Sequence, residues 1–93
     1  MYVDVYEHED GRVSVCVGDD GLDEYTTMIQ ETEYPELKEW EIPVKHIKTL
    51  EFEQFHEPGL EINTVKDTVE NVIKKLMDHF SEPHYALGFL TDS

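Results

Sequence analysis

Carboxylates are the side chains of this 93-residue chain whose number and spacing could do chemistry. The chain has 22 Asp and Glu residues against 7 Lys and Arg residues, which gives a formal net charge of −15. Six glutamates form three pairs in which the members are two residues apart: Glu31/Glu33, Glu39/Glu41 and Glu51/Glu53. On a strand, such a pair projects from one face at a spacing of roughly 6.5 to 6.8 Å, close to the roughly 6.8 Å by which two base steps advance along one DNA strand. The spacing therefore predicts carboxylates arranged like the phosphates of nucleic acid.

The acids are concentrated in the first two thirds of the chain. Residues 1–62 hold 17 acids and 4 bases, whereas residues 63–93 hold 5 acids and 3 bases. Within the first part, residues 19–41 hold nine acids and a single base, Lys38. We predict that a partner binds the following carboxylates between residues 19 and 57: Asp19, Asp20, Asp23, Glu24, Glu31, Glu33, Glu36, Glu39, Glu41, Glu51, Glu53 and Glu57.

The sign of the charge restricts the class of partner. Affinity for a phosphate backbone comes from Lys and Arg side chains that release counterions, so direct binding of DNA or RNA is not expected. An anionic membrane surface is disfavoured for the same reason. The expected partner is a basic protein, and a nucleic-acid-binding protein fits this description best.

Metal, cofactor and catalytic chemistry have weaker signals. None of the histidines has the spacing of a zinc motif, and we expect all five on the surface: His8, His46, His56, His79 and His84. Residues 18–24 are rich in Gly and Asp but lack the order of a calcium loop. Cys16 lies among acids, which raise the pKa of a thiol and make it a poor nucleophile. We therefore expect no metal, no cofactor and no enzymatic activity.

The length and the lack of a targeting signal set the context of these side chains. A chain of 93 residues can bury one hydrophobic core, so we expect a single domain over residues 1–93. No apolar run is long enough to cross a membrane, and the first residues lack the basic and apolar regions of a signal peptide. With Cys16 as the only cysteine, these features favour a cytoplasmic protein.

Several segments have the pattern of β-strands. Valines alternate with polar residues over residues 2–8 and 13–17, and Asp10-Gly11 between them is typical of a hairpin turn. Residues 24–29 are rich in strand formers and predict a third strand. Residues 40–44, with Trp40 in the core, predict a fourth strand or an extended edge, and residues 47–55 also have strand character.

The last third of the chain changes to a helical period. Apolar residues recur every three or four positions, which predicts an amphipathic helix over about 64–80 with Asn63 or Thr64 as its N-cap. The tail, residues 81–93, carries Tyr85, Leu87 and Phe89 in alternation. We expect it to add a strand or to form the contact of a homodimer.

Together these patterns predict an α+β fold. We expect an antiparallel sheet of about four or five strands, with an acidic β half over 1–62 and one C-terminal amphipathic helix, within 63–80, packed on one face. The face that carries Tyr, Asp, Ser and Cys is expected to be the more exposed one. The expected core is Val3, Val5, Val13, Val15, Ile29, Leu50, Phe52, Val69, Val72, Ile73, Leu76 and Phe80.

In size, charge and predicted layout, residues 4–61 resemble the phage-encoded DNA-mimic proteins. The resemblance implies an acidic inhibitor that acts in the host cytoplasm. Its target would be a basic DNA-binding host protein such as a nucleoid protein, nuclease, polymerase or repair enzyme, from which it displaces DNA. Three other classes remain open: an immunity- or antitoxin-type inhibitor of a basic nuclease, a structural or regulatory subunit whose acidity is incidental, and a protein whose acidic surface serves solubility and binds no partner.

Overall fold

The structure is a computed structural model that describes residues 2–18, 22–52 and 61–80. It confirms the predicted α+β class and the antiparallel sheet. The elements follow the chain in the order β1 (Tyr2–His8), β2 (Val13–Gly18), α1 (Leu22–Thr32), the 3-10 helix η1 (Glu39–Glu41), β3 (Val44–Glu51), β4 (Glu61–Val65) and α2 (Val69–His79).

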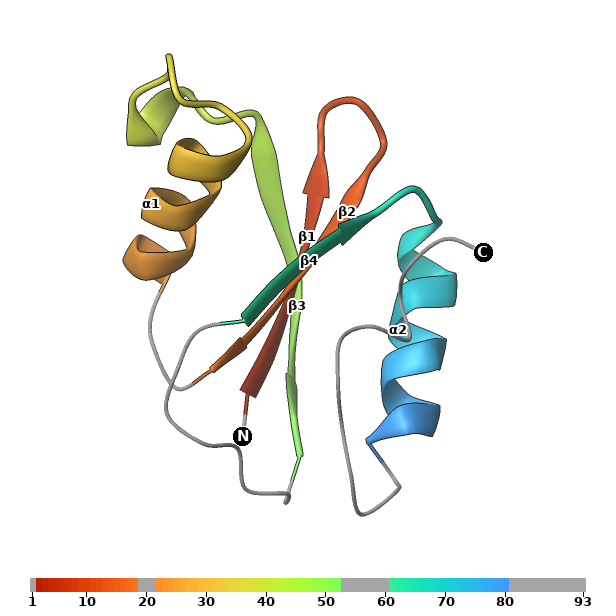
Figure 1. The fold of residues 1–93 in the computed structure, drawn as a ribbon. Helices are drawn as coiled ribbons and strands as arrows, with labels where there is room; N and C mark the ends of the chain where they lie inside the picture. Colours follow the sequence, from red (N-terminus) through yellow and green to blue (C-terminus); the bar gives the residue numbers. More distant parts are fainter. Residues whose placement is uncertain (1, 19–21, 53–60, 81–93) are drawn as a thin grey trace.

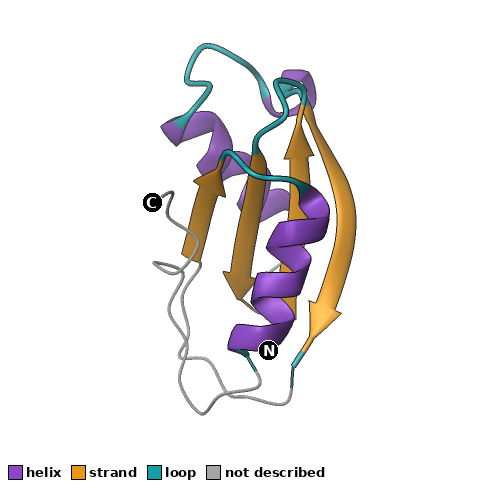
Figure 2. Cartoon of the chain, turned by 90° about the vertical axis from the view of Figure 1, so that its right-hand side faces the viewer, coloured by secondary structure: helices purple, strands orange, loops and turns teal. Residues whose placement is uncertain are grey.

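The four strands form one sheet in the order β3-β1-β2-β4, and every neighbouring pair is antiparallel. Helix α1 lies on one side of this sheet and α2 on the other (Figure 1). In the view turned by 90°, α2 lies in front of the strands and α1 behind them (Figure 2). The molecule therefore has three layers: the predicted C-terminal helix packs on one face of the sheet, and α1, which was not predicted as a helix, covers the other.

The turn between β1 and β2 is the predicted Asp-Gly turn. Gly11 has a φ of +93°, a conformation that residues with a side chain rarely adopt, and its N–H donates to the carbonyl of His8 at 3.0 Å. The carboxylate of Asp10 accepts from the N–H of Arg12 at 3.0 Å and from its Nε at 2.7 Å. Local chemistry therefore sets this hairpin, and the sheet is built around it.

One face of the sheet packs against α2 and forms the larger core. The valines of β1 and β2 on this face, together with Val72 and Leu76 of α2, are completely buried. Eleven of the twelve predicted core residues lie in this cluster or pack against it: Val3, Val5, Val13, Val15, Leu50, Phe52, Val69, Val72, Ile73, Leu76 and Phe80. The alternation of valine with polar residues explains this success, because alternate residues of a strand share a face.

The other face packs against α1 and forms a second core. Its buried side chains include Tyr6 and Cys16 of the hairpin and Tyr25 and Ile29 of α1. The rings of Tyr6 and Tyr25 are stacked, with centroids 3.7 Å apart and planes 6° from parallel. Ile29 is buried as predicted, but on this face. The expectation that this face is the more exposed one is wrong.

The predicted third strand over residues 24–29 is also wrong, because this segment lies in α1. Tyr25 and Ile29 are four positions apart, so on a helix they fall on the same side and both reach the sheet. Thr26 and Thr27 favour strands by intrinsic preference, yet they stand outside this buried stripe. Packing of the stripe outweighed the local preference.

The middle of the chain differs from the prediction as well. Residues 39–41 are the 3-10 helix η1 and not part of a strand, and strand β3 begins only at Val44, after Pro43. Trp40, expected in the core, is 79% exposed. Strand β4 was not predicted, and Thr64 and Val65, assigned to the helix, belong to it.

Helix α2 confirms the predicted C-terminal helix but begins at Val69, several residues later than expected. Its N-cap is Thr68, not Asn63 or Thr64, and the hydroxyl of Thr68 accepts from the N–H of Asn71 at 3.2 Å. Asp67 accepts from the N–H of Thr68 at 2.7 Å, which supports the same turn. Strand β4 ends at Val65, and two residues, Lys66 and Asp67, separate it from this cap.

The Thr68→Ala variant should lose about 1 kcal/mol of unfolding free energy, because an N–H at the start of α2 loses its side-chain acceptor. Urea denaturation followed by circular dichroism measures the loss. Thr68→Ser keeps the hydroxyl and should retain most of the stability. Equal losses in the two variants would contradict the role of Thr68 as a cap.

The additional strand or dimer contact predicted for residues 81–93 lies outside the described residues. In the described part of the chain, neither helix has the length and apolar character needed to cross a membrane.

Candidate partner-binding surface

The predicted partner-binding acids fall into three groups. The first group is carried by α1, η1 and the turn between them: Asp23, Glu24, Glu31, Glu33, Glu36, Glu39 and Glu41. Glu51 stands apart, at the far end of β3 from η1. The remaining acids lie outside the described residues: Asp19, Asp20, Glu53 and Glu57. We call residues 22–41 the acidic layer.

The acidic layer differs in charge from the layer on the other side of the sheet. Residues 22–41 contain seven acids and one base, Lys38, whereas residues 66–80, which include α2, contain three acids and three bases. The two layers lie on opposite faces of the sheet (Figure 1). Glu31, Glu36, Glu39 and Glu41 of the acidic layer are exposed. The surface charge is therefore directional, and one side of this molecule is strongly negative.

Two of the three predicted pairs of strand carboxylates do not lie on strands, and Glu53 of the third pair lies outside the described residues. Glu31 lies in α1 and Glu33 in the turn that follows it, while Glu39 and Glu41 lie in a 3-10 helix. Successive residues of a helix turn by about 100°, so members of a pair two positions apart point in different directions. The argument from strand spacing is wrong for these two pairs. The acids are gathered by the fold of α1 and η1 and not by a repeat along a strand.

Two of these glutamates hold η1 in place. Glu39 Oε1 accepts from the hydroxyl of Thr27 in α1 at 2.8 Å, and Glu41 Oε2 accepts from the backbone N–H of Lys38 at 3.1 Å. Ile42, the next residue, is buried in the second core. Glu39 and Ile42 thus fix the position of η1 against α1, whereas the carboxylate of Glu41 stabilises the first turn of η1 itself.

Trp40 lies between these glutamates and is the most exposed large hydrophobic side chain of the described residues. The Nζ atom of Lys38 is 5.3 Å from the centroid of its ring, within the range of a cation–π contact. An exposed tryptophan among carboxylates has the composition of the centre of a protein interface, where aromatic anchors supply affinity and charges guide approach.

A buried polar network lies beneath the acidic layer, where the C-terminal end of α1 meets the hairpin. Arg12 Nη2 donates to the hydroxyl of Tyr34 at 2.9 Å, and this hydroxyl is 2.9 Å from Nδ1 of His8. Nε2 of His8 is 2.5 Å from the hydroxyl of Ser14, which is 2.7 Å from the hydroxyl of Thr64. The chain of contacts links both strands of the hairpin to β4 and to the turn after α1.

A neutral His8 satisfies the donors and acceptors of this network. In that arrangement the hydroxyl of Tyr34 accepts from Arg12 and donates to Nδ1 of His8, while Nε2 carries the imidazole hydrogen and donates to Ser14. Burial lowers the pKa of His8 below its ordinary value, against the opposing effect of Glu33. The prediction that His8 is a surface residue is therefore wrong: it is buried at the end of β1.

Two atoms at the edge of this network have no hydrogen-bond partner in the described part of the chain, the hydroxyl of Tyr25 and Oε2 of Glu33. Oε2 of Glu33 is 3.7 Å from Nε2 of His8, a contact that becomes an ion pair only if His8 is protonated. Burial raises the pKa of Tyr25, and the nearby hydroxyl of Ser14 opposes that rise. The two hydroxyls are not aligned well enough to form a hydrogen bond. The contact between Glu33 and His8 thus depends on the protonation state of His8.

Ser14, His8 and Glu33 resemble a catalytic triad in composition but not in geometry. In a triad the carboxylate orients the imidazole from the nitrogen opposite the serine, whereas here that nitrogen, Nδ1, contacts Tyr34. Ser14 is completely buried within the sheet, where a substrate cannot reach its hydroxyl. The cluster therefore holds the hairpin against α1, and its role is structural.

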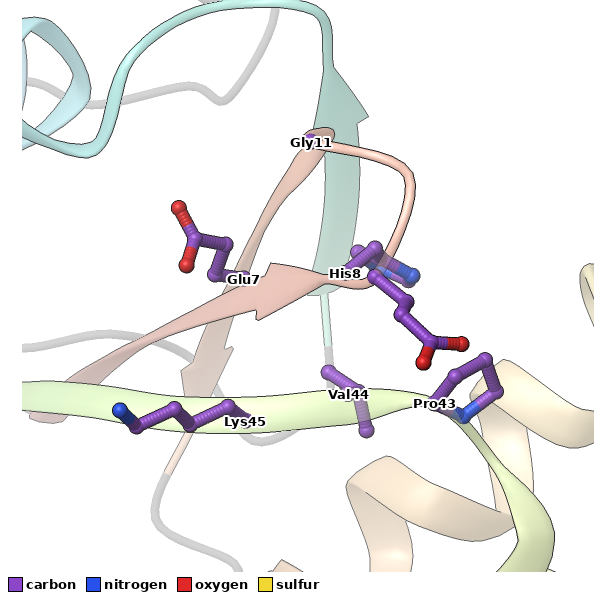
Figure 3. Close-up of a pocket in the computed structure, with 7 residues that line it drawn as sticks. Glu7, His8, Gly11, Pro43, Val44 and Lys45 are labelled. Atoms are coloured by element: carbon purple, nitrogen blue, oxygen red, sulfur yellow. The ribbon is translucent and has the colours of Figure 1, made fainter.

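A shallow hollow lies next to this network, at the start of β3 (Figure 3). Its lining is formed by Glu7, His8, Glu9, Gly11, Pro43, Val44 and Lys45. The side chain of His8 is turned into the core, so the hollow offers an exposed mixture of charges and no buried polar group for a ligand. Within residues 2–18, 22–52 and 61–80, no three metal-ligating side chains gather.

The sequence prediction missed Trp40 as a surface residue and missed the network around His8. A signal for Trp40 was available, because Glu39 and Glu41 flank it in a short segment between Pro35 and Pro43. No local signal identified His8, whose side-chain partners come from β2 and from the turn after α1. Comparison of the chain with protein-family models, with curated proteins and with solved structures finds no match.

Proposed function

We propose that this protein binds a basic nucleic-acid-binding protein through its acidic layer and competes there with nucleic acid. The observation that carries the proposal is the difference in charge between the two outer layers, seven acids with one base on one side and an equal number of acids and bases on the other. A nucleic-acid-binding partner presents the complementary surface, rich in Lys and Arg.

The structure favours a compact anionic surface over a linear imitation of a DNA strand. Glu31 and Glu36 are exposed and have no ion pair within the described residues, so their charges remain available to a partner. Glu39 and Glu41 are fixed by their hydrogen bonds. Carboxylates on a rigid scaffold lose less conformational entropy on binding than those of a disordered acidic tail.

A competition experiment tests this proposal. The protein, immobilised, captures basic proteins from a lysate of its source, and each captured protein is purified and bound to a fluorescent DNA duplex. Addition of the free protein should release the duplex and lower its anisotropy. The affinity should fall steeply between about 50 and 200 mM salt, because exposed charges are screened at this ionic strength.

A pair of double variants shows whether the acidic layer is responsible. Glu31→Gln/Glu36→Gln should weaken the competition roughly threefold to tenfold. Glu70→Gln/Asp78→Asn removes the same number of charges from α2 and should have a much smaller effect. Equal effects would show that net charge alone acts and would contradict a binding surface in the acidic layer.

The same assay separates displacement of DNA from the immunity-type alternative. If the captured partner holds the duplex and this protein together at full occupancy of both, competition with nucleic acid is wrong. An inhibitor that binds beside the active site of a basic nuclease would give this result.

A further inference from the structure

Trp40 is unusual in both its exposure and its position. It is the only tryptophan of the chain, it is 79% exposed, and it lies between two glutamates in the acidic layer. A single exposed apolar side chain is common on protein surfaces, so what distinguishes Trp40 is the type of its side chain and its surroundings. Trp is also the residue type most enriched among the side chains that dominate binding energy in protein interfaces.

The backbone around Trp40 is held in one position. Within η1, the N–H of Glu41 donates to the carbonyl of Lys38 at 2.8 Å, and the side chain of Glu41 accepts from the N–H of Lys38 at 3.1 Å. The side chain of Glu39 bonds to Thr27 of α1, and Ile42 anchors the end of the segment in the core. The indole is therefore presented by a fixed support, which reduces the entropy cost of binding.

The indole already contacts a cation. Nζ of Lys38 lies 5.3 Å from the ring centroid, which indicates that the ring is accessible to positive charge at cation–π distance. The carboxylates of Glu39 and Glu41 flank the ring in sequence, and both are exposed. A planar cation could stack on the indole and pair with a carboxylate at the same time. Guanidinium has this shape, whereas the compact ammonium group of lysine does not.

We propose that Trp40, with the flanking carboxylates of Glu39 and Glu41, forms a receiving site for an arginine side chain of the basic partner. This inference rests on the proposed function and adds to it that the partner is recognised through arginine more than through lysine. A second copy of this chain does not fit the site. Its single arginine, Arg12, is bound to Asp10 at 2.7 Å and to Tyr34 at 2.9 Å.

Two synthetic peptides of equal charge, octa-arginine and octa-lysine, serve as probes. Because Trp40 is the only tryptophan, its fluorescence reports binding at the site directly, and calorimetry gives the affinity independently. Octa-arginine should bind the wild-type protein roughly threefold to tenfold more tightly than octa-lysine and should shift the emission of Trp40.

Variants of the exposed side chains separate the indole from the general effect of charge. Trp40→Ala should reduce the preference for arginine to nearly equal affinities, and Trp40→Phe should keep a part of it, since Phe binds cations less strongly than Trp. Met77→Ala removes another exposed apolar side chain, on α2, and should leave the preference unchanged. Circular dichroism confirms that each variant is folded.

The outcomes distinguish this inference from the proposed function. Equal affinity of the wild-type protein for both peptides, or an arginine preference that survives in Trp40→Ala, overturns the arginine site. If, in that case, the Glu31→Gln/Glu36→Gln double variant still weakens the competition with DNA, the proposed function stands without the site. If neither peptide binds and no DNA is displaced, both proposals fail.

Discussion

Replacement of Leu76 by alanine is expected to lower the free energy of unfolding by about 2 to 4 kcal/mol. Leu76 is completely buried where α2 packs on the sheet, in the cluster that contains the valines of β1 and β2. The alanine variant buries less apolar surface when it folds, and its folded core contains a cavity where the side chain was. A loss of this size is a large part of the total stability expected for a domain of 93 residues.

Urea denaturation followed by far-UV circular dichroism measures this effect. The fluorescence of Trp40 is less suitable, because its side chain is exposed in the folded protein. Met77, the next residue of α2, is 57% exposed, so Met77→Ala is the matched control and should change the stability by less than about 0.5 kcal/mol. Similar losses in both variants would show that α2 does not pack on the sheet in this orientation.

Acidification below about pH 6.5 is expected to remove the stability that the neutral form of His8 contributes. Burial lowers the pKa of His8; Glu33 opposes this shift, Arg12 supports it and Asp10 opposes it. As the pH falls, the unfolded chain, in which His8 has its ordinary pKa, binds the proton first. The contribution is therefore complete above the unfolded pKa and is lost as the pH falls toward the folded pKa.

The size of this loss is limited to about 1.4 kcal/mol per pH unit for one titrating group. Protonation would also place a hydrogen on Nδ1 of His8, where the hydroxyl of Tyr34 donates in the neutral network. The loss must be separated from the carboxylates, because protonation of a chain with a net charge of −15 also relieves repulsion.

Urea denaturation of the wild-type protein and of His8→Gln, at several pH values from 7.5 to about 5, gives the difference in stability between them. This difference isolates the pH-dependent contribution of His8 to stability. The wild-type protein should lose its advantage over the variant as the pH falls. His46→Gln removes an exposed imidazole from β3, and this variant should keep the acid-dependent loss because His8 is still present. A constant difference between wild type and His8→Gln would contradict a neutral, buried His8.

Several elements could be predicted because their signals are local. The alternation of Val3 with Val5, and of Val13 with Val15, requires a strand with one buried face, and the Asp10-Gly11 turn sets the register between the two strands. The apolar stripe of α2 follows the helical period and identifies the helix without knowledge of its partner. The net charge, and its concentration in residues 1–62, are also properties of the sequence alone.

Other features depended on what covers the second face of the sheet. Residues 24–29 contain strand formers, and only the presence of an open sheet face explains why Tyr25 and Ile29 are buried from a helix instead. Strand β4 is short, and its place beside β2 is decided by pairing with residues almost fifty positions away. Sequence patterns within one segment carry no information about such a distant partner.

Three properties follow from the sequence alone: the acidity of the chain, its valine-rich hairpin and the amphipathic helix in its last third. The tertiary structure decided on which side the charge lies, that His8 is buried and that Trp40 is exposed. The physical reason is that periodicity reports the shape of one element, whereas burial depends on which other element covers it. The proposed arginine site depends on the exposure of Trp40, which is a property of the tertiary structure. The sequence pattern alone therefore does not identify this site.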